Sequence, residues 1–433
     1  MKKLNILFVF LFIATISIAQ VSDIETFIKQ QPQIVEINAI PGNDFFTKTY
    51  QIMVRQPLDH NDTTKGFFLQ RVFVADKAKT NPVVLGTEGY GAAYAAMPRY
   101  INELSTMLNA NQITVEHRYF GESWPSPLNW DYLTVKNANA DHHAVVQIFK
   151  KYYTGKWVNT GISKGGQTAV YHRAFYPDDV DVTVAYVGPL NFGVEDGRHE
   201  PFIANVPGTT EQREKIHNFQ LEILKNRAEI MPKLEKFITD KKFTFRIPHD
   251  AVLDYCVLEY PFALWQWGRL TDKVPTTDVG VDSLFNHLMK VSDPSYFSIE
   301  DQENIKTFFV QAARELGYYG YDWKPLKKYL SIKNAEGYLP EIFLPSDLRI
   351  KYSKKSAKEV SKFMKKTDEP ILLIYGQWDP WSATAFDVYS PNQVKVVKAG
   401  GSHSTRIKNL PADQQKLVKE KLETWLGVPV SLN

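Results

Sequence analysis

The chain has 433 residues with 51 basic and 48 acidic side chains, which gives a formal net charge of +3. A charge this close to balance does not favour binding to nucleic acid or to a strongly acidic partner. The length allows a large hydrophobic core and more than one domain. The single cysteine, Cys256, excludes an internal disulfide, and its apolar neighbours indicate a buried small side chain.

Residues 1–19 have the pattern of a secretory signal peptide. A basic start, Met1-Lys2-Lys3, precedes an apolar run over 4–18, and Ser17-Ile18-Ala19 offers small residues for cleavage. We therefore expect export to the periplasm or the medium. An uncleaved anchor is the alternative, although the apolar run is short for a membrane span. No other stretch is long and apolar enough to cross a bilayer, so we expect no membrane span after cleavage.

The first part of the mature chain predicts a sheet. The runs 47–54 and 67–74, joined by a turn-rich connector, predict an antiparallel pair at a sheet edge. Strands then alternate with helices, which predicts a mostly parallel sheet covered on both faces. The predicted strands are 82–85, 113–115, 156–160 and 182–187, and the predicted helices are 98–108, 141–153 and 167–175.

The alternation stops after Pro189. Helical spacing of apolar residues dominates 210–241 and 300–316, and an aromatic segment, 260–267, lies between them. Strands return at 371–375 and 393–397, followed by an amphipathic helix at 411–426. We interpret 20–190 and 366–433 as two parts of one α/β core and 191–365 as an inserted helical lid.

Residues 161–165, G-I-S-K-G, have the form G-x-S-x-G. They follow a predicted strand and precede a predicted helix, which is the context of a nucleophile elbow. The turn at an elbow is so tight that the residues beside the serine have to be small. We therefore predict that the Ser163 hydroxyl projects from the top of the sheet. The alternative is an ordinary loop in which the serine caps the helix.

A serine becomes a good nucleophile when a histidine accepts its proton and a carboxylate orients that histidine. In α/β-hydrolases the chain order is serine, acid, histidine, with the last two after late strands. Asp379 follows the predicted strand 371–375, and His403 follows the predicted strand 393–397. Order, position and residue type together predict a triad of Ser163, Asp379 and His403.

Other interpretations of these residues stay open. Asp379 precedes a proline and could be a turn or cap residue, and His403 could be a loop histidine among glycines. His199, at the entry to the lid, is an alternative base. The chain order disfavours the histidines that lie before or just after the elbow: His117, His142, His143 and His172.

The oxyanion formed during attack on a carbonyl needs hydrogen-bond donors. One donor should be the backbone amide of Lys164, which follows the serine. The second should come from the loop 86–91, where we favour the amide of Tyr90, with that of Gly89 as the alternative. The sequence has no HExxH motif or clustered ligand spacing, so we expect no metal and no cofactor.

Four motifs of this chain are typical of one group of enzymes. They are Thr87-Glu88-Gly89-Tyr90-Gly91, EHRYFGES at 116–123, GISKGGQT at 161–168, and Trp378-Asp379-Pro380-Trp381-Ser382. They resemble motifs of exported serine exopeptidases with an α/β-hydrolase core. The resemblance is closer to peptidase family S37, the PS-10 or prolyl tri/tetrapeptidyl aminopeptidase group, than to family S28, which contains Pro-X carboxypeptidase and dipeptidyl peptidase II.

The resemblance implies that Ser163 is the nucleophile, Asp379 the orienting acid and His403 the base. It also implies release of short peptides from a free N-terminus, often after proline. The S28 enzymes have Ser-Tyr in the elbow and several disulfides, whereas this chain has Ser-Lys and one cysteine. Substrate details are therefore not transferred from S28.

An exopeptidase has to recognise a charged terminus. Glu88 is our first choice for binding an ammonium group; otherwise it would brace Arg118 or a nearby amide. The other acidic candidates near the motif loops are Glu122, Asp196 and Glu200. The cations available for a terminal carboxylate are Arg118, Lys164 and Arg198.

The segment Glu116-His117-Arg118 is expected to form a buried polar brace below the site. A proline pocket needs flat aromatic walls, for which Trp378 and Trp381 are the first candidates, although lid core is the other interpretation for most of this group. The further aromatic candidates are Trp265, Trp267, Phe262 and Tyr318.

The sequence thus predicts an exported serine peptidase that releases dipeptides or tripeptides, with peptides as its partners. An esterase or lipase of the same fold is one alternative, because its chemistry would be identical. The second alternative is a non-catalytic binding protein that keeps the hydrolase fold without its activity. No oligomeric state is predicted.

Overall fold

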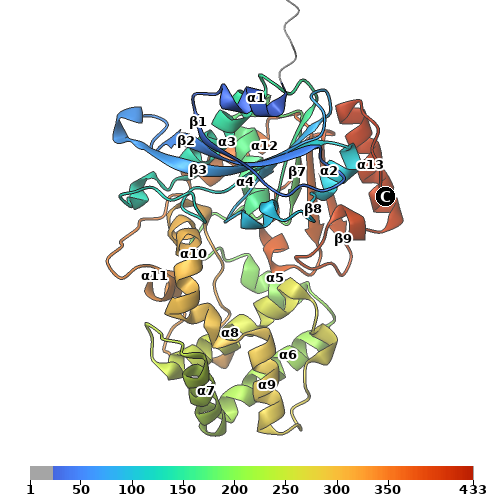
Figure 1. The fold of residues 1–433 in the computed structure, drawn as a ribbon. Helices are drawn as coiled ribbons and strands as arrows, with labels where there is room; N and C mark the ends of the chain where they lie inside the picture. The colour runs from blue at the N-terminus through green and yellow to red at the C-terminus, as the bar shows by residue number, and fades with distance from the viewer. Residues whose placement is uncertain (1–22, 433) are drawn as a thin grey trace, which may run out of the picture.

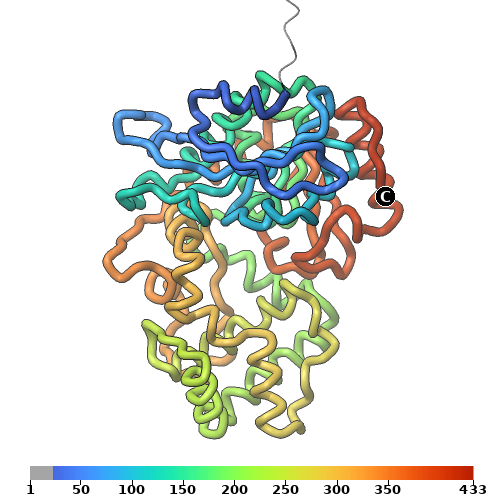
Figure 2. Tube along the Cα trace, viewed as in Figure 1, coloured from blue at the N-terminus to red at the C-terminus, as the bar shows by residue number. Residues whose placement is uncertain are grey.

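A computed structural model describes residues 23–432, so the predicted signal peptide lies outside the described residues. Figure 1 shows a sheet surrounded by helices and, below it, a second body made of helices. In Figure 2 the helical body is one continuous stretch coloured from green to orange, whereas the sheet body combines segments from both ends of the chain. The helical body is therefore an insertion into the sheet body.

The sheet has nine strands in the order β1-β2-β3-β5-β4-β6-β7-β8-β9. The pairs β1–β2, β2–β3 and β3–β5 are antiparallel, and every later pair in this order is parallel. The strands are β1 (Ile34–Ala39), β2 (Lys48–Pro57), β3 (Phe67–Asp76), β4 (Val83–Thr87), β5 (Asn111–Val115), β6 (Trp157–Ile162), β7 (Val182–Tyr186), β8 (Ile371–Gly376) and β9 (Gln393–Lys398).

Helices cover both faces of this sheet. Val83 and Leu85 of β4 pack in one cluster with α3, whereas Val84 between them packs in another cluster with α2 and α13. Burial on both faces explains why the central strands are continuous apolar runs. The arrangement confirms the predicted α/β-hydrolase fold. The core helices outside the insertion are α1 (Ile24–Lys29), α2 (Glu103–Leu108), α3 (Val135–Phe149), α4 (Lys164–Phe175) and α13 (Ala412–Leu426).

The chain between β7 and β8, which is described throughout, adds no strand to the sheet and builds the helical lid. Within the region 191–365 that the sequence assigns to the lid, α12 differs from the other helices because Ala357, Val360 and Met364 pack with β8. Although α12 lies within this region of the sequence, it packs against the sheet body and not in the lid core. The helices of the insertion are α5 (His199–Asn205), α6 (Thr210–Lys225), α7 (Arg227–Lys241), α8 (His249–Trp267), α9 (Val281–Val291), α10 (Ile299–Gln311), α11 (Tyr338–Phe343) and α12 (Lys355–Met364).

The lid has its own hydrophobic core, built around α8. Cys256 lies in it fully buried, as its apolar neighbours indicated. The same cluster contains Trp381, which belongs to the loop after β8. The lid core is thus continuous with a loop of the sheet body. In the part of the chain that the structure describes, each helix is too short or too polar to cross a membrane.

One carboxyl group lies deep in the lid core. Glu259 of α8 accepts hydrogen bonds from the hydroxyls of Tyr319 and Tyr321 at 2.8 and 2.9 Å. Burial raises the pKa of Glu259 from 4.5 to about 8, because the ionised form loses its hydration. Below the ordinary carboxyl pKa both the folded and the unfolded chain hold this proton. Between the ordinary carboxyl pKa and the raised pKa of the folded chain, only the folded chain holds this proton.

The free energy of unfolding should therefore fall between about pH 5 and about pH 8 through Glu259. Replacing it by glutamine keeps an oxygen for both tyrosines and removes the titration. We expect the melting temperature of Glu259→Gln, relative to the natural chain, to rise steadily over this range. Comparing the two proteins at each pH cancels the contribution of all other groups. A difference that does not change with pH would contradict the interpretation.

Candidate active site

The elbow sits between β6 and α4. Ser163 has φ 58° and ψ −123°, a backbone conformation that non-glycine residues rarely adopt. Its amide donates to Tyr186 O of the neighbouring strand at 2.8 Å, and its carbonyl accepts from Gln167 N at 2.9 Å. These bonds hold the strained turn, and no side-chain capping bond forms. The hydroxyl is therefore left available, unlike that of an ordinary capping serine.

The glycines around Ser163 are required by close contacts. A Cβ on Gly161 would lie 2.2 Å from the backbone of Gly165, and one on Gly166 would lie 2.6 Å from Tyr186 O. These distances are too short for any side chain. The small residues of the motif therefore allow α4 to begin directly against the sheet.

The loops after β8 and β9 bring Asp379 and His403 together. His403 Nδ1 is 2.7 Å from Asp379 Oδ2, and both side chains are buried. The other carboxylate oxygen of Asp379 accepts from Trp381 N at 3.1 Å, so the acid also caps the turn that follows it. A neutral histidine that donates through Nδ1 leaves Nε2 free to accept a proton. The pair has the geometry of a base and its orienting acid.

The backbone of His403 is attached to the lid. Its amide donates to Gln266 O, near the end of α8, at 2.8 Å. The ring of Trp267 meets the imidazole edge to face with 6.0 Å between centroids. The position of the imidazole thus depends on the lid as well as on the sheet.

Among residues 23–432, Ser163 Oγ forms no hydrogen bond, and none joins it to His403. Such bonds are often long before substrate binds and tighten in the complex. His199, the alternative base, has both ring nitrogens engaged, by Pro380 O at 3.1 Å and Asn191 Oδ1 at 3.2 Å. Burial lowers its pKa to about 4, which makes it a poor proton acceptor near neutral pH.

A small cavity of about 20 Å³, roughly the room that one water molecule needs, adjoins Ser163. It brings together the predicted residues Tyr90, Lys164 and Trp381. Trp378, by contrast, packs its ring against Trp265 with 5.6 Å between centroids. The remaining residues that line the cavity were not predicted: Gln167, Pro189, Asn191, Phe308, Leu316 and Gly317. Phe308 and Gly317 come from the lid, and no sequence pattern indicates which lid residues reach the elbow.

The loop after β4 is fixed by the side chain of Lys164. Its ammonium group donates to Gly89 O and lies 5.4 and 4.9 Å from the ring centroids of Tyr90 and Phe120. In a trans peptide the carbonyl and the following N–H point in opposite directions. Because Gly89 O faces Lys164, the amide of Tyr90 faces the other way, and no described residue accepts from it. This geometry favours Tyr90 over Gly89 as the second oxyanion donor.

Replacing Lys164 by methionine tests this arrangement, since the backbone amide of residue 164 is kept. We expect kcat to fall by about 100- to 1,000-fold, the range for loss of one oxyanion donor, with little change in KM. Lys164→Arg, which restores a donor, should recover part of the loss. A melting curve separates this effect from unfolding. Equal activity of the natural chain and Lys164→Met would show that Lys164 does not position the loop.

The other predicted cations are occupied. Arg118 binds both oxygens of Asp141, at 2.6 and 2.7 Å, and is fully buried. Glu116 is also buried and accepts from Arg71 at 2.6 Å, so this segment braces the loops below the site. Arg198 is paired with Asp196 at 2.7 Å. Neither arginine is placed to bind a substrate carboxylate.

Glu88, the first choice for binding an ammonium group, accepts from Tyr94 OH. Burial raises its pKa, and the nearby Lys164 ammonium opposes that rise. Burial also lowers the pKa of Lys164 well below its ordinary value, with Glu88 opposing. Burial therefore disfavours the charged form of both groups, and their mutual attraction offsets only part of this effect. Binding of a terminal amine by Glu88 stays a prediction.

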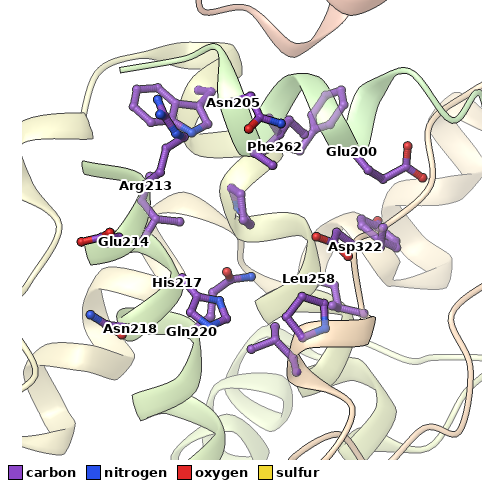
Figure 3. Close-up of a pocket in the computed structure, with 18 of the residues that line it drawn as sticks. Glu200, Asn205, Arg213, Glu214, His217, Asn218, Gln220, Leu258, Phe262 and Asp322 are labelled. Atoms are coloured by element: carbon purple, nitrogen blue, oxygen red, sulfur yellow. The ribbon is translucent and has the colours of Figure 1, made fainter. Parts of the chain in front are cut away.

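A second, larger cavity lies within the lid (Figure 3). It has a volume of about 650 Å³ and is bounded by α5, α6, α8 and the segment 320–326. Phe262 and Trp265 of α8 form part of its wall. The lid therefore offers a space that is large enough for several residues of a bound peptide.

A model of the family described as PS-10 peptidase S37 matches residues 19–432. The prolyl tri/tetrapeptidyl aminopeptidase of Streptomyces mobaraensis is 30% identical over 409 residues, which cover 92% of this chain and 83% of the relative. These two similarities extend over the sheet body and the lid alike.

Solved structures are less similar. Proline iminopeptidase of Mycobacterium smegmatis is 14% identical, with 86% of this chain and 98% of that chain covered and a TM-score of 0.41. A 2-hydroxy-6-oxo-6-phenylhexa-2,4-dienoate hydrolase of Rhodococcus is 10% identical, with 90% and 100% covered and a TM-score of 0.37. Similarity at this level adds nothing to the assignment of function.

Proposed function

This chain belongs to the PS-10 peptidase S37 family of serine peptidases, and we propose that it is an exported aminopeptidase that releases short peptides from free N-termini. The 30% identity to a prolyl tri/tetrapeptidyl aminopeptidase over 92% of the chain carries this proposal. Export is proposed from the signal-peptide pattern of residues 1–19.

We assign the chemistry to Ser163, His403 and Asp379. His403 Nε2 accepts the proton of Ser163 Oγ while that oxygen attacks the scissile carbonyl carbon. The amides of Lys164 and Tyr90 bind the resulting oxyanion. Collapse of the intermediate breaks the C–N bond, and His403 returns the proton to the leaving amine. Water then attacks the ester on Ser163 by the same sequence of proton transfers, and the N-terminal fragment is released.

A preference for proline before the cleaved bond has support from the small cavity beside Ser163. Trp381 forms one wall of it, and Tyr90 and Phe308 contribute further rings. A proline ring packs well against flat aromatic faces and has no N–H that would need a partner. The side chain before the scissile bond is therefore proposed to sit between these rings, which have to move apart because the cavity has a volume of only about 20 Å³.

A digest of defined peptides tests the function. Peptides with free and with acetylated N-termini are incubated with the full mature chain, and the fragments are identified by mass spectrometry. We expect dipeptides or tripeptides to be released much faster from the free set than from the acetylated set. Equal cleavage of both sets would exclude amine recognition and hence an aminopeptidase.

Two further results would overturn the proposal. Hydrolysis of a nitrophenyl ester without cleavage of any peptide would indicate an esterase, because the triad chemistry is shared by both classes. Failure of a fluorophosphonate to label Ser163 would indicate a non-catalytic protein. Labelling together with peptide cleavage is the expected outcome.

A further inference from the structure

The lid cavity has an acidic end. In Figure 3, Glu200 and Asp322 lie on one side of the cavity, and Arg213 and Glu214 lie on the other. The carboxylate of Glu195 adds to the acidic end, because Oε1 of Glu200 and Oε2 of Glu195 both lie against Gly320, 2.6 and 3.6 Å from where a Cβ would stand. Negative charge is therefore concentrated where α5 meets the segment 320–322.

The charge of Glu200 is not neutralised by the protein. Among the described residues, no lysine, arginine or histidine forms an ion pair with Glu200 or Asp322, and the buried atom Oε2 of Glu200 has no hydrogen-bond partner. Burial, and then the nearby charge of Asp322, raise the pKa of Glu200. Glu200 is half-buried, and a buried carboxylate oxygen without a partner is costly. A cationic ligand with several donors would remove this cost.

The other acidic candidates named from the sequence already have partners. Glu122 is bound by Arg71 at 2.5 Å, and Asp196 is bound by Arg198 at 2.7 Å. Glu88 accepts from Tyr94 and is close to Lys164. Glu200 is thus the candidate whose carboxylate lines a cavity and has no cation.

This acidic end is close to the elbow. His199, the residue before Glu200, packs its ring on Trp381 with 5.5 Å between centroids, and Trp381 packs on Phe262 with 5.3 Å between centroids. Trp381 lines the Ser163 cavity, whereas Phe262 lines the lid cavity. One layer of aromatic rings therefore separates the two cavities, and a peptide that occupies both has to shift these rings.

A short stretch of chain joins one wall of the Ser163 cavity to one wall of the lid cavity. Gly317 lines the Ser163 cavity and Gly320 lines the lid cavity. Three residue steps span at most about 11 Å, even when fully extended. A tripeptide in an extended conformation covers about 7 to 10 Å between its first nitrogen and its last carbonyl. An N-terminal fragment of about three residues is therefore similar in length to the greatest span between these two glycines.

From these observations we propose that Glu200, assisted by Asp322, binds the free α-ammonium group of the substrate in the acidic end of the lid cavity. The proposal rests on the proposed aminopeptidase function and names its specificity-determining site. It places the scissile carbonyl at Ser163 and the terminal amine beyond the aromatic layer. The distance between these two sites then determines how many residues the released N-terminal fragment contains.

The test compares Ala-Ala-Pro-p-nitroanilide with its N-acetylated form. For each variant the readout is the ratio of the two kcat/KM values, which cancels general loss of activity. In Glu200→Gln, kcat/KM for the free amine should fall by about 10- to 100-fold, the effect of losing one charged hydrogen bond, while the acetylated substrate is unaffected. Asp322→Asn should lower the ratio less. The matched control is Glu211→Gln, an exposed acid on α6 that does not line the cavity.

The possible failures are distinguishable. If the natural chain cleaves neither substrate, the proposed function is wrong. If it prefers the free amine and Glu200→Gln keeps that preference, the function stands and the assignment of Glu200 is overturned. Loss of the preference in Glu88→Gln, with Glu200→Gln unchanged, would place the amine site at Glu88 instead. Fluorophosphonate labelling of each variant confirms that Ser163 is still active.

Discussion

Ser163→Ala is expected to lower kcat for a peptide substrate by on the order of 10⁶-fold, the loss found when a serine nucleophile is removed. The acyl-enzyme cannot form without Oγ, and no other described hydroxyl occupies the elbow between β6 and α4. Alanine fits the same space, so the melting temperature should change little. Activity is measured with the p-nitroanilide substrate, and melting by circular dichroism.

The matched control is Ser283→Ala, which alters an exposed serine of α9 in the lid. It should retain full activity and full labelling by a fluorophosphonate, whereas Ser163→Ala should not be labelled. A Ser163→Ala protein that is folded and still cleaves peptides at more than a hundredth of the natural rate would rule out Ser163 as the nucleophile.

Asp379→Asn is expected to lower kcat by about 10⁴-fold with the fold intact. The asparagine oxygen can still accept from Trp381 N, which leaves its NH₂ group facing His403 Nδ1. That nitrogen then has to act as an acceptor, so the proton moves to Nε2 and the imidazole cannot take a proton from Ser163. Steady-state kinetics measure the loss.

Asp413→Asn, in the first turn of α13, is the control for a change of charge alone and should leave kcat unchanged. A loss of less than about tenfold in Asp379→Asn would mean that the hydrogen bond to His403 is structural and that another group orients the base.

The parallel part of the sheet was predictable because its strands are buried on both faces and therefore read as apolar runs. β1 was not predicted, since it is an edge strand in which two exposed residues follow each half-buried one, with no long apolar run. α3 begins at Val135, before the predicted start at 141, because Thr134 caps it and the polar residues Asn137 and Asn139 are buried within it. The predicted helix 98–108 begins only at Glu103, after its cap Asn102.

At the site, chain order singled out Asp379 and His403, which the structure holds in hydrogen-bond contact. The contact of the Lys164 side chain with Gly89 O could not be predicted, because it depends on how closely two loops approach each other. The acidic end of the lid cavity could not be predicted from the sequence either. It joins Glu200 to Asp322, which lie more than a hundred residues apart in the chain and meet only after the lid has folded.

The hydrogen bond from the amide of His403 to Gln266 O has a consequence for engineering this protein. A lid that merely covered the sheet could be shortened or exchanged with that of a relative, as a detachable module. Here the last turn of α8 supports the loop that carries the imidazole, so a transplanted lid would have to reproduce that attachment as well as the shape of the cleft. Chimaeras in which a foreign lid replaces the last turn of α8 are therefore expected to lose turnover even where they bind peptide.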